Sequence, residues 1–125
     1  MQSVQYVAYN YLSAMGGFLQ SIINGYGGVR LHHRGMELDP ALPPNATSLN
    51  FIGLDYLGSS IDIYVTKSEM LTVVTRQDYA APLLRLYVYE PEENHQLLLK
   101  QEVRIQRRRA VILPANAPLP SLDLL

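Results

Sequence analysis

The stretch from Gly25 to Pro44 divides the sequence into two parts with different patterns of apolar residues. Before it, apolar residues recur at three- and four-residue intervals, which is typical of a helix. After it, apolar runs are short, alternate with polar residues and end at turn residues, which is typical of strands. Glycines at 25, 27 and 28 release the backbone from the helix. The sequence therefore predicts one helix followed by a β domain.

The apolar residues of the N-terminal part lie on one side of a predicted helix over Val4–Ile23. They are Val4, Val7, Ala8, Tyr11, Leu12, Met15, Phe18, Leu19, Ile22 and Ile23. Ser3 fits the N-cap of this helix and Gly25 its C-terminal stop. Gly16 and Gly17 each cost about 1 kcal/mol relative to alanine inside a helix. They therefore predict either the close approach of a packing partner outside this chain or a kink.

Short alternating runs in the second part predict a series of strands. In Ser59–Thr66, for example, every second residue is apolar, so apolar and polar side chains point to opposite faces. The predicted strands are Val29–His32, Met36–Leu38, Ser48–Leu54, Ser59–Thr66, Met70–Val74, Leu83–Tyr89, Gln96–Lys100, Val103–Gln106 and Ala110–Leu113. Short strands separated by turns at intervals of about ten residues indicate a β-sandwich.

The composition is that of a globular chain with no electrostatic preference for a polyanion. Its 125 residues are 48% hydrophobic and 17% charged, with a net charge of −1. This length indicates one domain, or one domain with an appended helix, and the charge gives no attraction to nucleic acid or to an anionic membrane. The absence of cysteine excludes disulfides and thiolate metal sites. No apolar run reaches the roughly 18 residues of a membrane span.

Two motifs resemble glycoside hydrolase family 65. Gly-Gly-Val-Arg at 27–30, followed by Leu-Asp-Pro-Ala-Leu-Pro-Pro at 38–44, is similar to the start of the C-terminal β-domain of that family. Met-Gly-Gly-Phe-Leu-Gln at 15–20 resembles a run on the final helix of its catalytic barrel. The family contains acid trehalases, maltose and kojibiose phosphorylases, and glucosidases that act on glucosylated hydroxylysine of collagen. The helix motif is most similar to this last group.

The resemblance implies a fold that is mainly β, a two-layer jelly-roll-like sandwich preceded by one long helix. Residues 1–25 are expected to be the last helix of an (α/α)6 barrel, 26–113 the C-terminal β-sandwich and 114–125 an irregular proline-rich tail. Met1 is then expected to be an internal start or a fragment boundary. The partner implied is the upstream catalytic barrel of the same polypeptide.

The resemblance also implies that this chain is a non-catalytic fragment and is inactive alone. The parent would be an inverting glycosidase that hydrolyses the α-linked glucose of collagen glucosyl-galactosyl-hydroxylysine. In the family the general acid and the substrate contacts lie on barrel loops upstream of the helix. No catalytic, substrate-binding or metal residue and no cofactor is therefore expected here. A trehalase or phosphorylase parent, a carbohydrate-binding module and a free-standing interaction module stay open as alternatives.

The carboxylates give no independent sign of a glycosidase pair, which needs two facing carboxyl groups with one of them protonated. Most of the eleven acidic residues lie in predicted turns or at polar strand positions. Glu90, Glu92 and Glu93 share one turn, where solvent is expected to keep them ionised. Asp55 and Asp62 flank a hairpin and are interpreted as edge charges.

The histidines do not form a metal site in this interpretation. His32 and His33 are adjacent on a strand and point to opposite faces, so they cannot chelate one ion. His95 lies in a predicted turn far away in sequence. The triplet Asn45–Thr47 is an N-glycosylation acceptor in a predicted exposed loop.

A basic cluster and a set of tyrosines complete the candidates. The basic cluster consists of Arg104, Arg107, Arg108 and Arg109. Because no aromatic residues are interleaved with it, a solvated turn with Glu102 as a partner is a better interpretation than a nucleic-acid site. Tyr64, Tyr87 and Tyr89 occupy polar positions of two strands and would form a sugar platform if they shared an outer face.

Overall fold

The described part of the chain consists of β-strands and their connections. The computed structural model describes residues 4–9, 28–32, 35–42 and 44–118, with side chains for 28–30, 35–42 and 44–118. Its strands are β1 Val4–Tyr9, β2 Val29–His32, β3 Gly35–Leu38, β4 Ala46–Tyr56, β5 Ser59–Thr66, β6 Glu69–Gln77, β7 Leu84–Val88, β8 Glu93–Leu97, β9 Glu102–Gln106 and β10 Ala110–Pro114. These ranges contain no helix, and so none that is long and apolar enough to cross a membrane.

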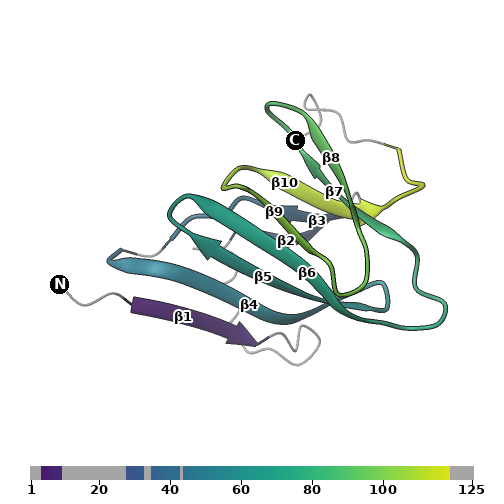
Figure 1. Ribbon diagram of the computed structural model, residues 1–125, viewed down its shortest axis with the longest axis horizontal. Coiled ribbons are helices and arrows are strands. Elements are labelled where there is room, and N and C mark those ends of the chain that lie inside the picture. Colours follow the sequence, from purple (N-terminus) through teal and green to yellow (C-terminus); the bar gives the residue numbers. More distant parts are fainter. Residues whose placement is uncertain (1–3, 10–27, 33–34, 43, 119–125) are drawn as a thin grey trace.

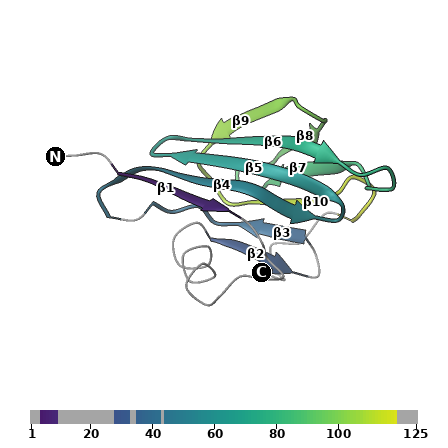
Figure 2. The ribbon, with the colours of Figure 1, turned by 90° about the horizontal axis from the view of Figure 1, so that it is seen from below.

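The strands form two five-stranded sheets that pack face to face (Figures 1 and 2). Sheet A has the order β1-β4-β5-β6-β9 and sheet B the order β2-β3-β10-β7-β8. β1 pairs with β4 in parallel, and the other neighbours pair antiparallel. The architecture is therefore mainly β with two layers, as predicted. The jelly-roll description and the domain boundaries stay predictions.

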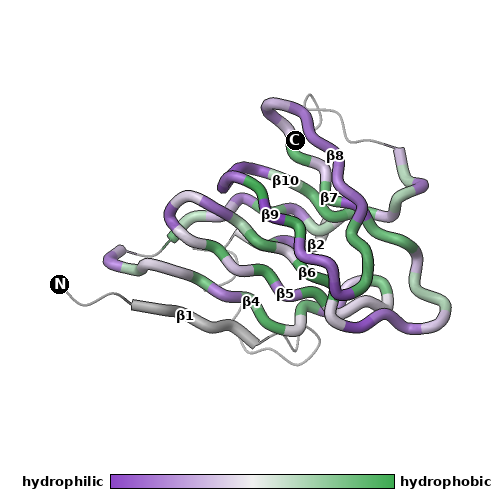
Figure 3. The backbone as a smooth tube through the Cα atoms, in the orientation of Figure 1, coloured by the Kyte–Doolittle hydropathy of each residue, from purple (hydrophilic) through white to green (hydrophobic). Residues whose placement is uncertain are grey.

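One apolar core lies between the sheets. In β5 buried and half-buried residues alternate, so Ile61, Ile63 and Val65 face the core, as predicted. The largest fully buried side chains come from both sheets: Phe51, Met36, Leu38, Leu49, Leu54, Ile61, Ile63, Met70, Leu84, Leu86, Leu97 and Ile112. Burying each side chain of this size stabilises the fold by about 1.5–3 kcal/mol. Figure 3 shows the resulting alternation of hydrophobic and hydrophilic positions along the central strands.

A β-bulge in β4 keeps its apolar residues on the core face. Relative to β5, β4 gains one extra residue between Phe51 and Leu54. Gly53 lies in this bulge with a φ of 71°, a left-handed conformation that favours glycine. Its N–H donates to Asp62 Oδ1 at 2.8 Å, and Asp62 Oδ2 accepts from the Tyr64 hydroxyl at 3.2 Å. Asp62 is therefore a structural acceptor on a central strand, and its interpretation as an edge charge is wrong.

The helix predicted over Val4–Ile23 is wrong for its first part, because Val4–Tyr9 forms β1. This strand runs beside β4 from the pair Val4↔Ala46 to the pair Tyr9↔Ile52. Four of its six residues are β-branched or aromatic and therefore favour strands, namely Val4, Tyr6, Val7 and Tyr9. Over so short a segment, apolar spacing does not distinguish a helix from a strand that pairs with a sheet edge. Residues 10–23, including both glycines of the predicted helix, lie outside the described residues.

The other strand predictions agree with the structure, except at β8. Val29–His32 and Gly35–Leu38 form the predicted hairpin, and β5 has the predicted bounds. The strand predicted over Gln96–Lys100 instead spans Glu93–Leu97. The prediction was based on the apolar run Leu97–Leu99. β8 is instead an edge strand, which tolerates polar residues.

The bulge makes a testable contribution to stability. Gly53→Ala should lower the free energy of unfolding by about 1–2 kcal/mol, because alanine disfavours the left-handed backbone. Asp62→Ala should lower it by about 1–3 kcal/mol, because the Gly53 N–H loses its acceptor. Urea denaturation measures both values.

Asp55→Ala is the matched control, since its contact with Arg76 is 3.9 Å long and both side chains are exposed. We expect that variant to stay within about 0.5 kcal/mol of the wild type. Wild-type stability for both bulge variants would show that the bulge is not a structural requirement.

Candidate functional site

Most of the charged candidates gather where the β7–β8 turn meets the β9–β10 loop. β10 and β8 are the two neighbours of β7 in sheet B, so the connections that precede β10 and follow β7 lie side by side. The turn contributes Glu90 and Glu92, β8 begins with Glu93, and the loop contributes Arg108 and Arg109. The order of strands in sheet B thus brings together opposite charges that are far apart in the sequence. Their spacing along the chain does not predict this contact.

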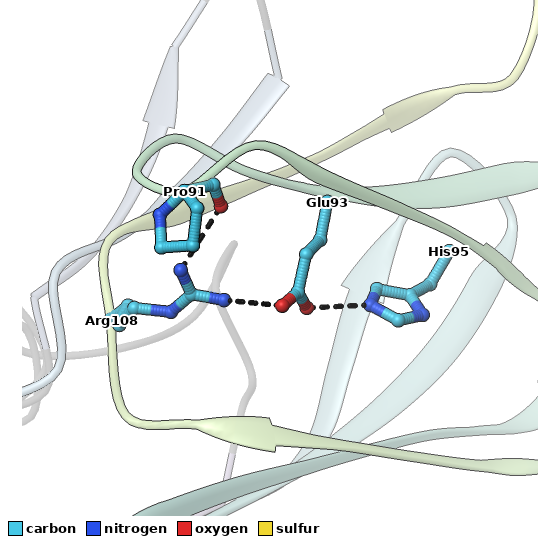
Figure 4. A network of polar contacts seen from close by, with 4 residues as sticks. All are labelled: Pro91, Glu93, His95 and Arg108. Carbon is cyan, nitrogen blue, oxygen red and sulfur yellow. Dashed lines mark hydrogen bonds and ion pairs between the residues drawn. The ribbon is translucent and has the colours of Figure 1, made fainter.

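Glu93 bridges an arginine and a histidine in this region (Figure 4). Its Oε1 lies 2.9 Å from Arg108 Nη2, and its Oε2 lies 3.1 Å from His95 Nε2. Arg108 Nη1 also donates to the Pro91 carbonyl oxygen at 3.0 Å. The hydrogen bond from His95 and the contacts with Arg108 lower the pKa of Glu93. A lowered pKa favours the ionised form, which is the opposite of what a general acid needs.

A second buried cluster lies on the outer face of sheet B. It consists of Tyr87, Tyr89, Val111 and Leu113. The Tyr89 hydroxyl lies 3.1 and 3.2 Å from the two carboxylate oxygens of Glu37, which is itself buried. The Arg109 guanidinium lies over the Tyr89 ring at 5.4 Å. Sheet B is therefore packed on both faces, and Glu37 is held by a tyrosine hydroxyl.

The tyrosines do not form the sugar platform that was considered. Tyr87 and Tyr89 share a face and meet edge to face with centroids 5.5 Å apart, but only 7% and 6% of them is exposed. Tyr64 lies on β5 in sheet A, so the idea of a face shared by all three is wrong. Burial, together with the carboxylate of Glu92, raises the pKa of Tyr87 and keeps its hydroxyl protonated.

A small cavity opens beside this cluster. It has a volume of about 330 Å³ and is lined by Tyr89, Glu90, Arg108 and Arg109. This is at the lower end of the range for ligand pockets, and its lining offers the hydrogen-bond donors of two arginines, a tyrosine hydroxyl and one carboxylate. The cavity can hold a small polar molecule.

The basic cluster separates into different contacts. Arg104 pairs with Glu69, and this contact raises the pKa of Arg104, to which Glu102 adds a smaller contribution. Arg108 pairs with Glu93, and Arg109 stacks on Tyr89. Arg104 is exposed, as expected, but its main partner is Glu69 rather than Glu102. For Arg108 the expectation is wrong, because its side chain is largely covered and pairs with Glu93.

The remaining candidates take simple positions. His95 lies on β8 and not in a turn, which follows from the shift in that strand. His32 ends β2, while its side chain and all of His33 lie outside the description. Asn45 is exposed in the turn before β4, as predicted. Within the residues searched, no three or more potential metal ligands gather.

The structural role of Gly53 and Asp62 was missed in the sequence. A glycine inside an apolar alternating run signals a bulge, and this signal was available at Gly53. The contact between Arg108 and Glu93 had no comparable signal, because it depends on the order of strands in sheet B.

The fold and these contacts define a two-layer β domain with a charged loop end, and its sequence is similar to part of a group of glycosidases. It is 40% identical over 76 residues to the protein-glucosylgalactosylhydroxylysine glucosidase of Gallus gallus. It is 43% identical over 69 residues to the protein of that name from Dictyostelium discoideum, and 37% over 78 residues to that from Mus musculus. The resemblance to protein-glucosylgalactosylhydroxylysine glucosidases is therefore confirmed.

The similarity covers a small share of these relatives. The three alignments cover 61%, 52% and 62% of this chain but 11%, 10% and 11% of the relatives. The chain thus spans about a tenth of the length of the curated relatives that it matches. Neither a protein-family model nor a solved structure matches the chain.

The Glu93 network predicts a pH dependence of stability. A carboxylate whose pKa is lowered by folding stabilises the fold above its unfolded pKa, and this contribution is lost as the pH falls through the folded value. Glu93→Gln should therefore be less stable than the wild type at neutral pH. The difference should shrink as the pH falls below the ordinary value of 4.5.

Thermal unfolding between about pH 6 and about pH 3 measures this difference. Glu90→Gln, in the turn that precedes β8, is the matched control because Glu90 is exposed, and it should follow the wild type. A constant difference between Glu93→Gln and the wild type at all pH values would contradict the assignment.

Proposed function

We propose that this chain is a non-catalytic β domain of a larger glycosidase that removes α-linked glucose from glucosyl-galactosyl-hydroxylysine of collagen. The observation that carries the proposal is the similarity to proteins named for this activity, of whose length the chain spans about a tenth. In this proposal the domain is the C-terminal jelly-roll-like sandwich of a family 65 enzyme and supports its (α/α)6 catalytic barrel.

The contacts of the carboxylates favour a structural role for this domain over a catalytic one. An inverting glycosidase needs a protonated carboxyl group and a carboxylate base about 6.5–9.5 Å apart, with room for water between them. Glu93 is held ionised by His95 and Arg108, and Asp62 is occupied by the bulge. Glu37 accepts from a tyrosine on the outer face of sheet B. The oxygens of each of these carboxylates are already bonded to a group of the fold, so they are not free to bind a substrate or a catalytic water.

In the longer polypeptide, the reaction is assigned to the upstream barrel. A glutamic acid would protonate the leaving glycosidic oxygen while a water molecule attacks the anomeric carbon from the opposite face. This mechanism requires nothing from residues 28–118 except that they keep the barrel folded.

Glucose release tests the proposal. The purified 125-residue chain should release no glucose from a glucosyl-galactosyl-hydroxylysine peptide. The longer polypeptide that contains it should release glucose with initial formation of the β-anomer, as an inverting enzyme does on an α-linkage. Proton NMR of the product distinguishes the anomers.

The substrate control is trehalose, and the phosphorylase control is the same assay with added phosphate. Turnover by the chain alone would contradict its non-catalytic role. Selective cleavage of trehalose, or the formation of glucose 1-phosphate, would contradict the proposed activity of the parent.

A further inference from the structure

The large apolar side chains that stay exposed gather at one end of the sandwich. Among the described residues they are Leu57, Tyr79, Leu83, Leu98 and Leu99. Tyr79 is fully exposed, and the exposed fractions of the four leucines lie between 38% and 50%. We call the surface formed by these five residues the apolar end.

Strand direction explains why residues so far apart in sequence share this end. β4, β6 and β8 end here and β5, β7 and β9 begin here, so three connections meet (lower right in Figure 1). The connections are tied to one another and to sheet A: the Asp78 N–H donates to the Gly58 carbonyl at 2.9 Å, and the Lys100 N–H to the Val74 carbonyl at 2.7 Å. The apolar end is therefore a set of loops fixed by main-chain hydrogen bonds.

The opposite end has the reverse character. Its loops carry Lys67, the acidic turn with Glu90 and Glu92, and the run Arg107–Arg109. None of the exposed large apolar side chains of the described residues lies there. The sandwich is therefore polarised, with charged connections at one end and apolar connections at the other.

We infer that the apolar end is the surface through which this domain contacts the rest of the longer polypeptide. An exposed cluster of large apolar side chains with a polar border marks an interaction surface. The border here is formed by the Asp55–Arg76 pair, Asp78 and Lys100. Tyr79 is the most exposed side chain of the set and offers the largest aromatic surface for such a contact.

The occupant follows from the share of the relatives that the chain spans. About nine-tenths of their length lies outside the part that this chain matches. A segment joined covalently to the domain is present at an effective concentration in the millimolar range and covers such a surface before a separate molecule does. The inference rests on the proposed function in one respect, that the chain is part of a longer polypeptide.

Cysteine accessibility tests the inference. The chain contains no cysteine, so single substitutions report defined positions. Tyr79→Cys and Leu57→Cys probe the apolar end, and Lys67→Cys and Glu92→Cys are matched controls at the charged end. All four side chains are exposed, so the substitutions leave the core intact. Maleimide labelling is followed by peptide mass spectrometry in the 125-residue chain and in the longer polypeptide.

In the longer polypeptide, the two probes of the apolar end should be labelled at least about tenfold more slowly than the two controls. In the 125-residue chain all four should be labelled at similar rates at every protein concentration. Hydrogen exchange of residues 78–83 in the unmodified longer polypeptide should show the same protection without any substitution.

Rapid labelling at position 79 in the longer polypeptide would overturn the inference. Protection that depends on the concentration of the 125-residue chain would overturn it in favour of a contact between two copies. Because labelling is independent of the glycoside that is hydrolysed, protection without glucose release would contradict only the proposed function. Glucose release without protection would contradict only this inference.

Discussion

The bulge at Gly53 determines which side chains of β4 reach the core, and the packing of both sheets depends on it. Side chains of a strand alternate between faces, so the same residues in a regular strand, without the bulge, would turn Asp55 inward and Leu54 outward. The bulge changes the phase after Phe51, and Asp62 accepts the N–H that the bulge leaves without a ladder partner. One carboxylate thereby allows both halves of β4 to face the same core.

The topology that builds this core also separates the two ends of the sandwich. The connections at one end carry opposite charges that neutralise one another, as in the contact between Glu93 and Arg108. The connections at the other end carry leucines and a tyrosine. Asp62, Glu37 and Glu93 are all held by contacts within the fold, which agrees with the proposal that catalysis is carried out elsewhere.

The sequence is sufficient to predict the parts of the fold that depend on local alternation. β5 and the β2–β3 hairpin have the predicted bounds within a residue, because their apolar residues recur with period two and end at turn residues. β1 was missed because its pairing with β4 is a tertiary contact that overrides an apolar spacing compatible with a helix. β8 was misplaced because a polar edge strand has no apolar alternation to reveal it. The position of the tyrosines on two different sheets, and the contact between Glu93 and Arg108, depend on strand order, which spacing along the chain does not encode.

The central claim is that residues 28–118 support a catalytic site without forming part of it. A structure of the longer polypeptide with a bound glucosyl-galactosyl-hydroxylysine analogue tests this claim most directly. The account predicts that the terminal glucose is bound entirely by residues outside this range, with Glu93 still joined to Arg108 and His95. A glucose whose anomeric carbon or glycosidic oxygen contacts a carboxylate of this range would contradict it.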